Sequence, residues 1–196
     1  MFTGIVERLG HVAAAARSDG GMRISVSAPD LDLKIGDSIA VNGVCLTVIE
    51  SRPDGFDAYV VLETLDKTNL GELRPDSTVN LERPMRADGR FDGHLVQGHV
   101  DGIGVVVAVE PEGDGTRIRV QLPTGLSRYV AVKGSIAVDG VSLTVAAAAG
   151  DEFEVALIPH TLEVTTLGVR PPGSHVNLEV DVIAKYVERM LSGRAK

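Results

Sequence analysis

The chain contains nearly the same eight residues twice, as VNGVCLTV at positions 41–48 and as VDGVSLTV at positions 138–145. Further matches follow at one constant offset along the chain, and among them residues 79–82 and 176–179 both read VNLE. Self-similarity of this kind predicts two copies of one folding unit. We therefore do not expect a single domain that is built from the whole chain without a repeat.

The boundaries of the two units follow from the same comparison. The segment TGIVE at residues 3–7 resembles QGHVD at residues 97–101, at a slightly shorter offset. Between the copies, PMRADGRFDG has the proline, glycine and charge that are typical of a linker. We therefore expect one domain at residues 1–87, a second at 88–181, and a separate tail at 182–196.

Short strands are the expected elements of both units. Residues 22–28 and 117–122 alternate apolar and polar side chains, which predicts half-buried strands. Asn-Gly at 42–43 and Asp-Gly at 139–140 are strong signals for tight hairpins. Only residues 62–70 and their counterparts 158–167 suggest short helical turns within the units. This pattern predicts two small closed or Greek-key barrels in tandem.

The tail has a different periodicity. Apolar pairs at 182–183, 186–187 and 190–191 recur at helical spacing, and Gly193 is a plausible stop. A single helix with one apolar stripe has to bury that stripe. The helix can do so by packing on its own barrel, or by bundling with copies of itself in an oligomer, and the sequence leaves both open.

Composition limits the class of partner. The net charge is -8 and the basic residues form no run, so a nucleic-acid partner is not expected.

The single cysteine, Cys45, cannot form an intramolecular disulfide, which fits a reducing compartment. The N-terminus does not resemble a signal peptide, and no stretch approaches the roughly 20 apolar residues of a membrane-spanning helix. We therefore expect a cytoplasmic protein without a membrane partner.

Cys45 and its counterpart Ser142 are the first candidates for chemistry. A free cysteine on a strand is most often a small buried hydrophobe. A serine at the matched position, however, shows that a polar group is tolerated there, and a thiol beside a tight turn at a barrel mouth could act as a nucleophile or a proton relay.

Hydroxyl groups recur at paired positions in both units. Their presence is explained either by the preference of threonine for strands or by a polyhydroxylated ligand bound in each unit. The residues are Thr47, Thr64, Ser142, Thr144 and Thr161.

The histidines suggest no metal site. His94 and His99 do not have the spacing of a helical metal pair, and no further ligands complete a zinc set. His11 and His175 are expected in loops.

The motifs together resemble a known family. MFTGIVE, NGVCLTV, ETLDKTNLG, GHLVQGHVDG, DGVSLTV, IPHTLEVTTLG and VNLEVD occur in the order found in riboflavin synthases of the alpha-chain type, a family with duplicated lumazine-binding barrels. The resemblance covers essentially the whole chain. It implies an all-β fold of two tandem, similar six-stranded Greek-key β-barrels plus a C-terminal α-helix. It also implies a homotrimer held together by those helices.

The resemblance implies a reaction as well. Each barrel would bind one molecule of 6,7-dimethyl-8-ribityllumazine, and a four-carbon unit would pass from one molecule to the other. The products would be riboflavin and 5-amino-6-(D-ribitylamino)uracil, in the last step of riboflavin biosynthesis. No cofactor and no metal would take part. The active site would lie between the N-terminal barrel of one subunit and the C-terminal barrel of a neighbour, and association with a lumazine synthase is left open.

Site residues carried over from the family fall into two groups. The first-barrel pocket would use Gly4, Ile5, Val6, Cys45, Leu46, Thr47, Tyr59, Val60, Val61, Leu62, Glu63 and Thr64. The second-barrel pocket would use Gly98, His99, Val100, Lys133, Ser142, Leu143, Thr144, Ala156, Leu157, Ile158, Pro159, His160 and Thr161.

The resemblance also suggests catalytic roles. Cys45 would assist addition or proton transfer, and His99 would carry a proton. Ser38 and Asp181 would be supporting polar groups, and Phe2 would shape the site. Which barrel holds the donor molecule is left open.

Two other functions are weighed against this one. Lumazine proteins share the duplicated fold but bind a single chromophore, and the intact motifs in both copies, with Cys45, favour the enzyme. Flavin-binding barrels of reductases need a following nucleotide-binding domain, for which this chain has no room.

Overall fold

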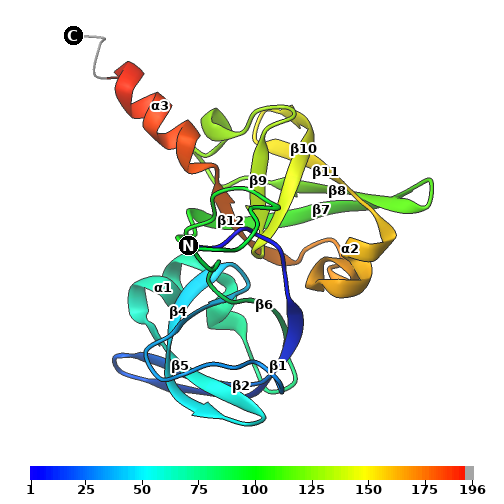
Figure 1. The fold of residues 1–196 in the computed structure, drawn as a ribbon. Helices are drawn as coiled ribbons and strands as arrows, with labels where there is room; N and C mark the ends of the chain where they lie inside the picture. The colour runs from blue at the N-terminus through cyan, green and yellow to red at the C-terminus, as the bar shows by residue number, and fades with distance from the viewer. Residues whose placement is uncertain (193–196) are drawn as a thin grey trace.

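Two closed antiparallel barrels make up the body of the computed structural model, which describes residues 1–192 (Figure 1). The first consists of β1 (Arg8–Ser18), β2 (Gly21–Ser27), β3 (Ser38–Val41), β4 (Val44–Arg52), β5 (Gly55–Val61), α1 (Leu62–Lys67), the 3-10 helix η1 (Asn69–Glu72) and β6 (Thr78–Glu82). The second consists of β7 (Gly102–Glu112), β8 (Gly115–Gln121), η2 (Ser127–Tyr129), β9 (Ser135–Val138), β10 (Val141–Ala149), β11 (Glu152–Leu157), α2 (Pro159–Val164), η3 (Thr166–Val169) and β12 (His175–Val180). Both barrels close in the same strand order, β1-β2-β5-β4-β3-β6 in the first. The predicted fold class is confirmed.

The two predicted hairpin turns have the expected backbone. Asn42 and Gly43 have φ angles of 45° and 76°, and Asp139 and Gly140 have φ angles of 46° and 78°. Positive φ at both central residues defines the type I′ turn, whose twist matches that of the flanking strands. The turns also meet each other, because a Cβ atom added to Gly43 would lie 2.6 Å from the backbone nitrogen of Gly140.

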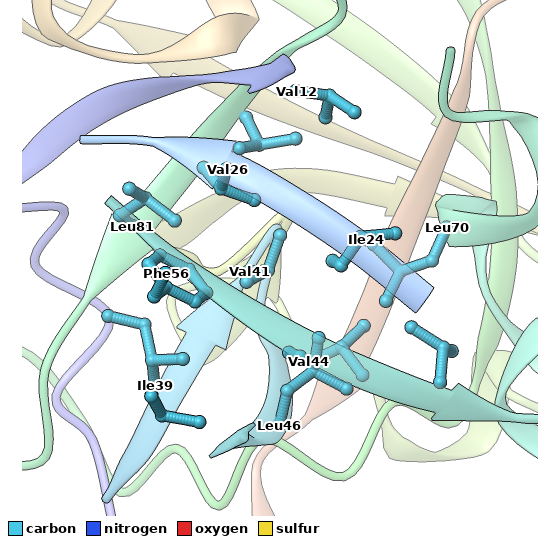
Figure 2. Close-up of a cluster of buried hydrophobic side chains, with 14 of the residues drawn as sticks. Val12, Ile24, Val26, Ile39, Val41, Val44, Leu46, Phe56, Leu70 and Leu81 are labelled. Carbon is cyan, nitrogen blue, oxygen red and sulfur yellow. The ribbon is translucent and has the colours of Figure 1, made fainter. Parts of the chain in front are cut away.

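Each barrel has its own apolar core. In the first barrel, side chains from all six strands and from η1 form one cluster that includes the fully buried Phe56 (Figure 2). Phe153 has the same place in the core of the second barrel. Burying a side chain of this size contributes about 1.5–3 kcal/mol. The packing therefore confirms that the alternating apolar residues of the strands face inward.

The identical VNLE segments connect the two barrels. The Nδ2 group of Asn80 donates to the Asp139 carbonyl oxygen at 2.8 Å, and the Nδ2 group of Asn177 donates to the Asn42 carbonyl oxygen at 2.8 Å. Their Oδ1 atoms accept backbone N–H groups from η3 and η1 respectively. These reciprocal contacts give the two barrels an approximate twofold relation, which explains why this part of the repeat is unchanged.

Helix α3 (Val182–Ser192) projects away from both barrels (Figure 1). Its polar side touches the second barrel, where Lys185 pairs with Asp101 at 2.7 Å and Glu188 accepts the Tyr129 hydroxyl at 3.0 Å. Its apolar stripe is exposed at Ile183, Tyr186, Val187, Met190 and Leu191. The alternative that this stripe packs on its own barrel is therefore wrong. Residues 193–196, including the predicted stop at Gly193, lie outside the described part of the chain.

Two smaller expectations also change. His11 and His175 lie in strands β1 and β12, not in loops. His175 is paired with Glu72 across the junction of the barrels. Within residues 1–192, no helix has the length and apolar character needed to span a bilayer.

Candidate ligand-binding sites

Strand β4 changes its partner halfway along its length. Residues 44–47 pair with β3, whereas pairing with β5 begins only at Val48, opposite Ala58. Strand β10 repeats this arrangement, because residues 141–144 pair with β9 and pairing with β11 begins at Val145. Each barrel therefore has a short strand edge that is not covered by its neighbouring strand.

Segments from the opposite half of the chain lie along these edges. We call residues 2–6 and 96–100 the lead segments, because they precede the first strand of each barrel. The Cys45 N–H donates to the Gly98 carbonyl oxygen at 2.9 Å, and the Ser142 N–H donates to the Gly4 carbonyl oxygen at 2.7 Å. Backbone groups of alternate residues point to the same side of a strand, so those of Thr47 and Thr144 are directed to the same edges.

The predicted grouping of the lead segments is wrong. Gly4, Ile5 and Val6 were expected in the first-barrel pocket, yet Val6 packs against the second-barrel core. Val100 in turn packs against the first-barrel core. The reason is an antiparallel bridge between Phe2 and Val96, which sends each lead segment past the other barrel.

Residues 98–100 lie beside the β4 edge, where the Cys45 N–H donates to the Gly98 carbonyl oxygen and Val100 packs against the first-barrel core. Cys45 is half-buried beside Phe2, Ala40, Val96 and Ala137, on the outer wall of the barrel between the two units and not at a barrel mouth. Ser38 lies opposite Thr47 in the β3–β4 pairing. The exposed side chains are those of Thr47, Tyr59, Val61, Leu62, Glu63 and His99, with Thr64 half-buried and Leu46 and Val60 turned into the core.

Residues 4–6 lie beside the β10 edge in the same way, where the Ser142 N–H donates to the Gly4 carbonyl oxygen and Val6 packs against the second-barrel core. Ser142, Leu143 and Thr161 are half-buried, and Leu157 belongs to the core. The exposed candidates of this set are Ile5, Lys133, Thr144, Ala156, Ile158, Pro159 and His160. The two edges therefore carry matching backbone groups but different side chains, a thiol in one and a serine hydroxyl in the other.

His94 lies next to Ser142, a placement that the sequence did not reveal. Its imidazole is buried, and its Nδ1 atom lies 2.7 Å from the Ser142 hydroxyl oxygen. Burial lowers the pKa of His94, and the negative charge of Asp181 partly opposes that change. His94 precedes the repeated segment and has no counterpart in the first copy, so the comparison of the two copies could not identify it.

Phe2 and Asp181 both have contacts that stabilise the fold. Phe2 is 1% exposed and fills the contact between the barrels. The Asp181 carboxylate accepts the Ile183 N–H at 2.9 Å, so it caps the N-terminus of α3 while also influencing His94.

A cavity of about 690 Å³ lies beside the linker between the barrels and is lined by Ile5 and Ser38. Its size is within the range of small-molecule pockets. It touches only these two predicted residues, whereas the edges of β4 and β10 carry Cys45, Thr47, Ser142 and Thr144. The edges are therefore the better-supported sites. Within residues 1–192, no cluster of three or more His, Cys, Asp or Glu side chains is suited to hold a metal ion.

Comparison with known proteins agrees with this architecture. The lumazine binding domain family matches the chain twice, at residues 3–84 and 97–181. The riboflavin synthase of Mycobacterium tuberculosis is 52% identical, over 97% of this chain and 98% of its own length. Those of Actinobacillus pleuropneumoniae and Bacillus subtilis are 46% and 40% identical, each over 97% of this chain and 90% of their own lengths.

The chain belongs to the riboflavin synthase family. The resemblance inferred from the repeated motifs is thereby confirmed, as is the expectation of an enzyme family. Solved structures of LumP complexed with riboflavin and with flavin mononucleotide have TM-scores of 0.84 and 0.82 against this chain. Their sequence identities are 26% and 25%, and each match covers 92% of this chain and 99% of the LumP chain. Riboflavin synthases and LumP therefore share the duplicated barrel seen here.

Proposed function

We propose that this member of the riboflavin synthase family converts two molecules of 6,7-dimethyl-8-ribityllumazine into riboflavin and 5-amino-6-(D-ribitylamino)uracil. A four-carbon unit leaves one substrate and joins the other, so the atoms of the two substrates equal those of the two products. The observation that supports this proposal best is the pair of matching open edges, one in each barrel. A reaction between two identical molecules requires two such sites.

Holding both molecules in place supplies much of the rate. Fixing two reactants in a productive orientation can contribute about 7–11 kcal/mol to lowering the barrier. The backbone groups of Thr47 and Thr144, which lie beyond the contacts with the lead segments, would bind the ring edges, and the neighbouring threonine side chains would bind the ribityl chains. The candidate residues grouped around each edge form the two proposed binding sites.

The two sites differ in their chemistry. His94, kept neutral by burial, accepts a proton from the Ser142 hydroxyl, which in turn removes a proton from the ring methyl of the substrate in the second barrel. In the first barrel, Cys45 assists addition to the substrate ring, and His99 carries a proton. Ser38 and Asp181 support these groups, and Phe2 shapes the site.

Subunits are proposed to combine as a homotrimer through the exposed stripe of α3. The apolar side chains at the open edges, among them Val61 at 52% exposed and Ile158 at 63% exposed, support a further covering surface there. A first-barrel site of one subunit would then face a second-barrel site of another. A cytoplasmic location and an association with lumazine synthase stay predictions.

The test mixes purified protein with 6,7-dimethyl-8-ribityllumazine alone and follows riboflavin absorbance with time. We expect turnover without added cofactor, and a decrease of about a hundredfold in kcat for Cys45→Ala. Full activity in Cys45→Ala would return the thiol to a packing role without affecting the reaction. Tight binding without any riboflavin formed would contradict the proposal and indicate a chromophore carrier.

A further inference from the structure

Two buried glutamates, Glu82 and Glu179, have no role in the proposed reaction. Glu82, at the end of β6, is 5% exposed and sits beneath the first lead segment. Its Oε1 atom accepts the Thr3 N–H at 2.6 Å and the Thr3 hydroxyl at 2.9 Å, and its Oε2 atom accepts the Gly4 N–H at 3.0 Å. Both carboxylate oxygens are therefore used to hold one stretch of backbone.

Glu179 does the same for the second lead segment. It is 3% exposed in β12, at the position that matches Glu82. Its Oε1 atom accepts the Gln97 N–H at 2.7 Å, and its Oε2 atom accepts the Gly98 N–H at 3.0 Å. Burial raises the pKa of both carboxyl groups, and the backbone donors counteract that rise.

The glycine held by each glutamate also touches the site of the opposite barrel. Gly4 donates its N–H to Glu82 and accepts the Ser142 N–H, while Gly98 donates to Glu179 and accepts the Cys45 N–H. A Cβ atom at Gly4 would lie 2.6 Å from Cβ of Ser142, and one at Gly98 would lie 2.5 Å from Cβ of Cys45. Positive φ angles of 77° and 79° also favour glycine at both positions.

We propose that Glu82 is a positioning residue for the second-barrel site and Glu179 a positioning residue for the first-barrel site. Each carboxylate acts through the lead segment that it holds, so that each barrel fixes the ligand edge of the other. The inference rests on the proposed function for its kinetic consequences, but its geometric part does not depend on turnover.

Glutamine variants test the assignment because an amide has the same shape but only one acceptor oxygen. In Glu82→Gln, the backbone amide NMR signal of Ser142 should shift while that of Cys45 stays in place. Glu179→Gln should give the reverse pattern. Riboflavin titrations followed at the same two signals should show about a tenfold weaker affinity at the affected site only. Glu50→Gln, an exposed carboxylate of the first barrel, is the control and should change neither signal.

Two results would contradict the crossed assignment of the glutamates. If Glu82→Gln disturbs the Cys45 signal more than the Ser142 signal, or if both variants weaken both sites equally, the crossed assignment is wrong. Should a glutamine variant fail to fold, the aspartate variant at that position retains both oxygens with a shorter reach and should give the same selective shift. Absence of turnover in the unmodified protein would overturn the proposed reaction, and the amide shifts without ligand would still decide the positioning role.

Discussion

At the scale of single residues, His94 joins the fold to the proposed chemistry. Its Nδ1 atom lies 2.7 Å from the Ser142 hydroxyl, while Cys45 at the matched position is surrounded by apolar side chains. The exchange of cysteine for serine therefore accompanies a change in neighbours. Similar backbone positions in the two barrels carry different side-chain surroundings, as the proposed reaction between two unequal partners requires.

The lowered pKa of His94 predicts a pH dependence of stability. The folded state holds the ring neutral, whereas the unfolded chain takes up a proton near the ordinary pKa of 6.5. Above pH 6.5 the ring is neutral in both states, so its titration does not change the free energy of unfolding. Below pH 6.5 the unfolded state takes up the proton first, so the free energy of unfolding falls as the pH drops towards the folded pKa. The loss is about 1.4 kcal/mol for each pH unit between the two pKa values.

His94→Asn removes the titration but keeps a side chain that can bond Ser142. Its free energy of unfolding, measured by urea between pH 5 and pH 8, should vary less with pH than that of the unmodified protein. Exposed His11→Asn is the control and should preserve the original profile. An unchanged profile in His94→Asn would show that this ring is not the group responsible.

At the scale of elements, the features that follow from local sequence pattern were predicted, whereas the contacts between distant segments were not. Alternating strands, type I′ turns and the helical stripe of α3 depend on local pattern and were predicted from the sequence. The crossing of residues 2–6 and 96–100 was not, because it depends on a bridge between Phe2 and Val96 that no local pattern contains. The partner of His94 was missed for the same reason, since Ser142 is close only after both barrels have packed.

Helix α3 predicts the route of assembly. Val187→Glu places a charge in the exposed apolar stripe, and a charge buried between helices would be costly. We expect this variant to sediment as a monomer and to lose most riboflavin formation, because paired sites would come from two subunits. Arg189→Glu, also exposed on α3 but outside the stripe, is the control and should remain oligomeric. A fully active monomer of Val187→Glu would contradict assembly through this stripe.

At the scale of the whole molecule, the twofold relation between the barrels is broken at the buried turn residues 42 and 139. Asp139 is fully buried and bonds Arg170 at 2.8 Å, while its counterpart is Asn42. The residue that matches Arg170 in the first barrel is Leu73. The Nδ2 group of Asn42 has no hydrogen-bond partner among residues 1–192. The aspartate of VDG thus has two partners that the asparagine of VNG lacks, the Arg170 cation and the Asn69 amide, which donates to the Asp139 carboxylate at 2.8 Å.

This asymmetry predicts how the junction responds to a symmetric substitution. Asn42→Asp places a buried carboxylate opposite a leucine, and an unpaired buried charge should lower the free energy of unfolding by about 3–5 kcal/mol. Adding Leu73→Arg supplies the partner that Asp139 already has, so the double variant should recover a large part of the loss. Urea unfolding of both variants measures this, with Leu73→Arg alone as the control. If the double variant is no more stable than Asn42→Asp, the arginine is not what permits an acid at this turn, and the difference between the two copies needs another cause.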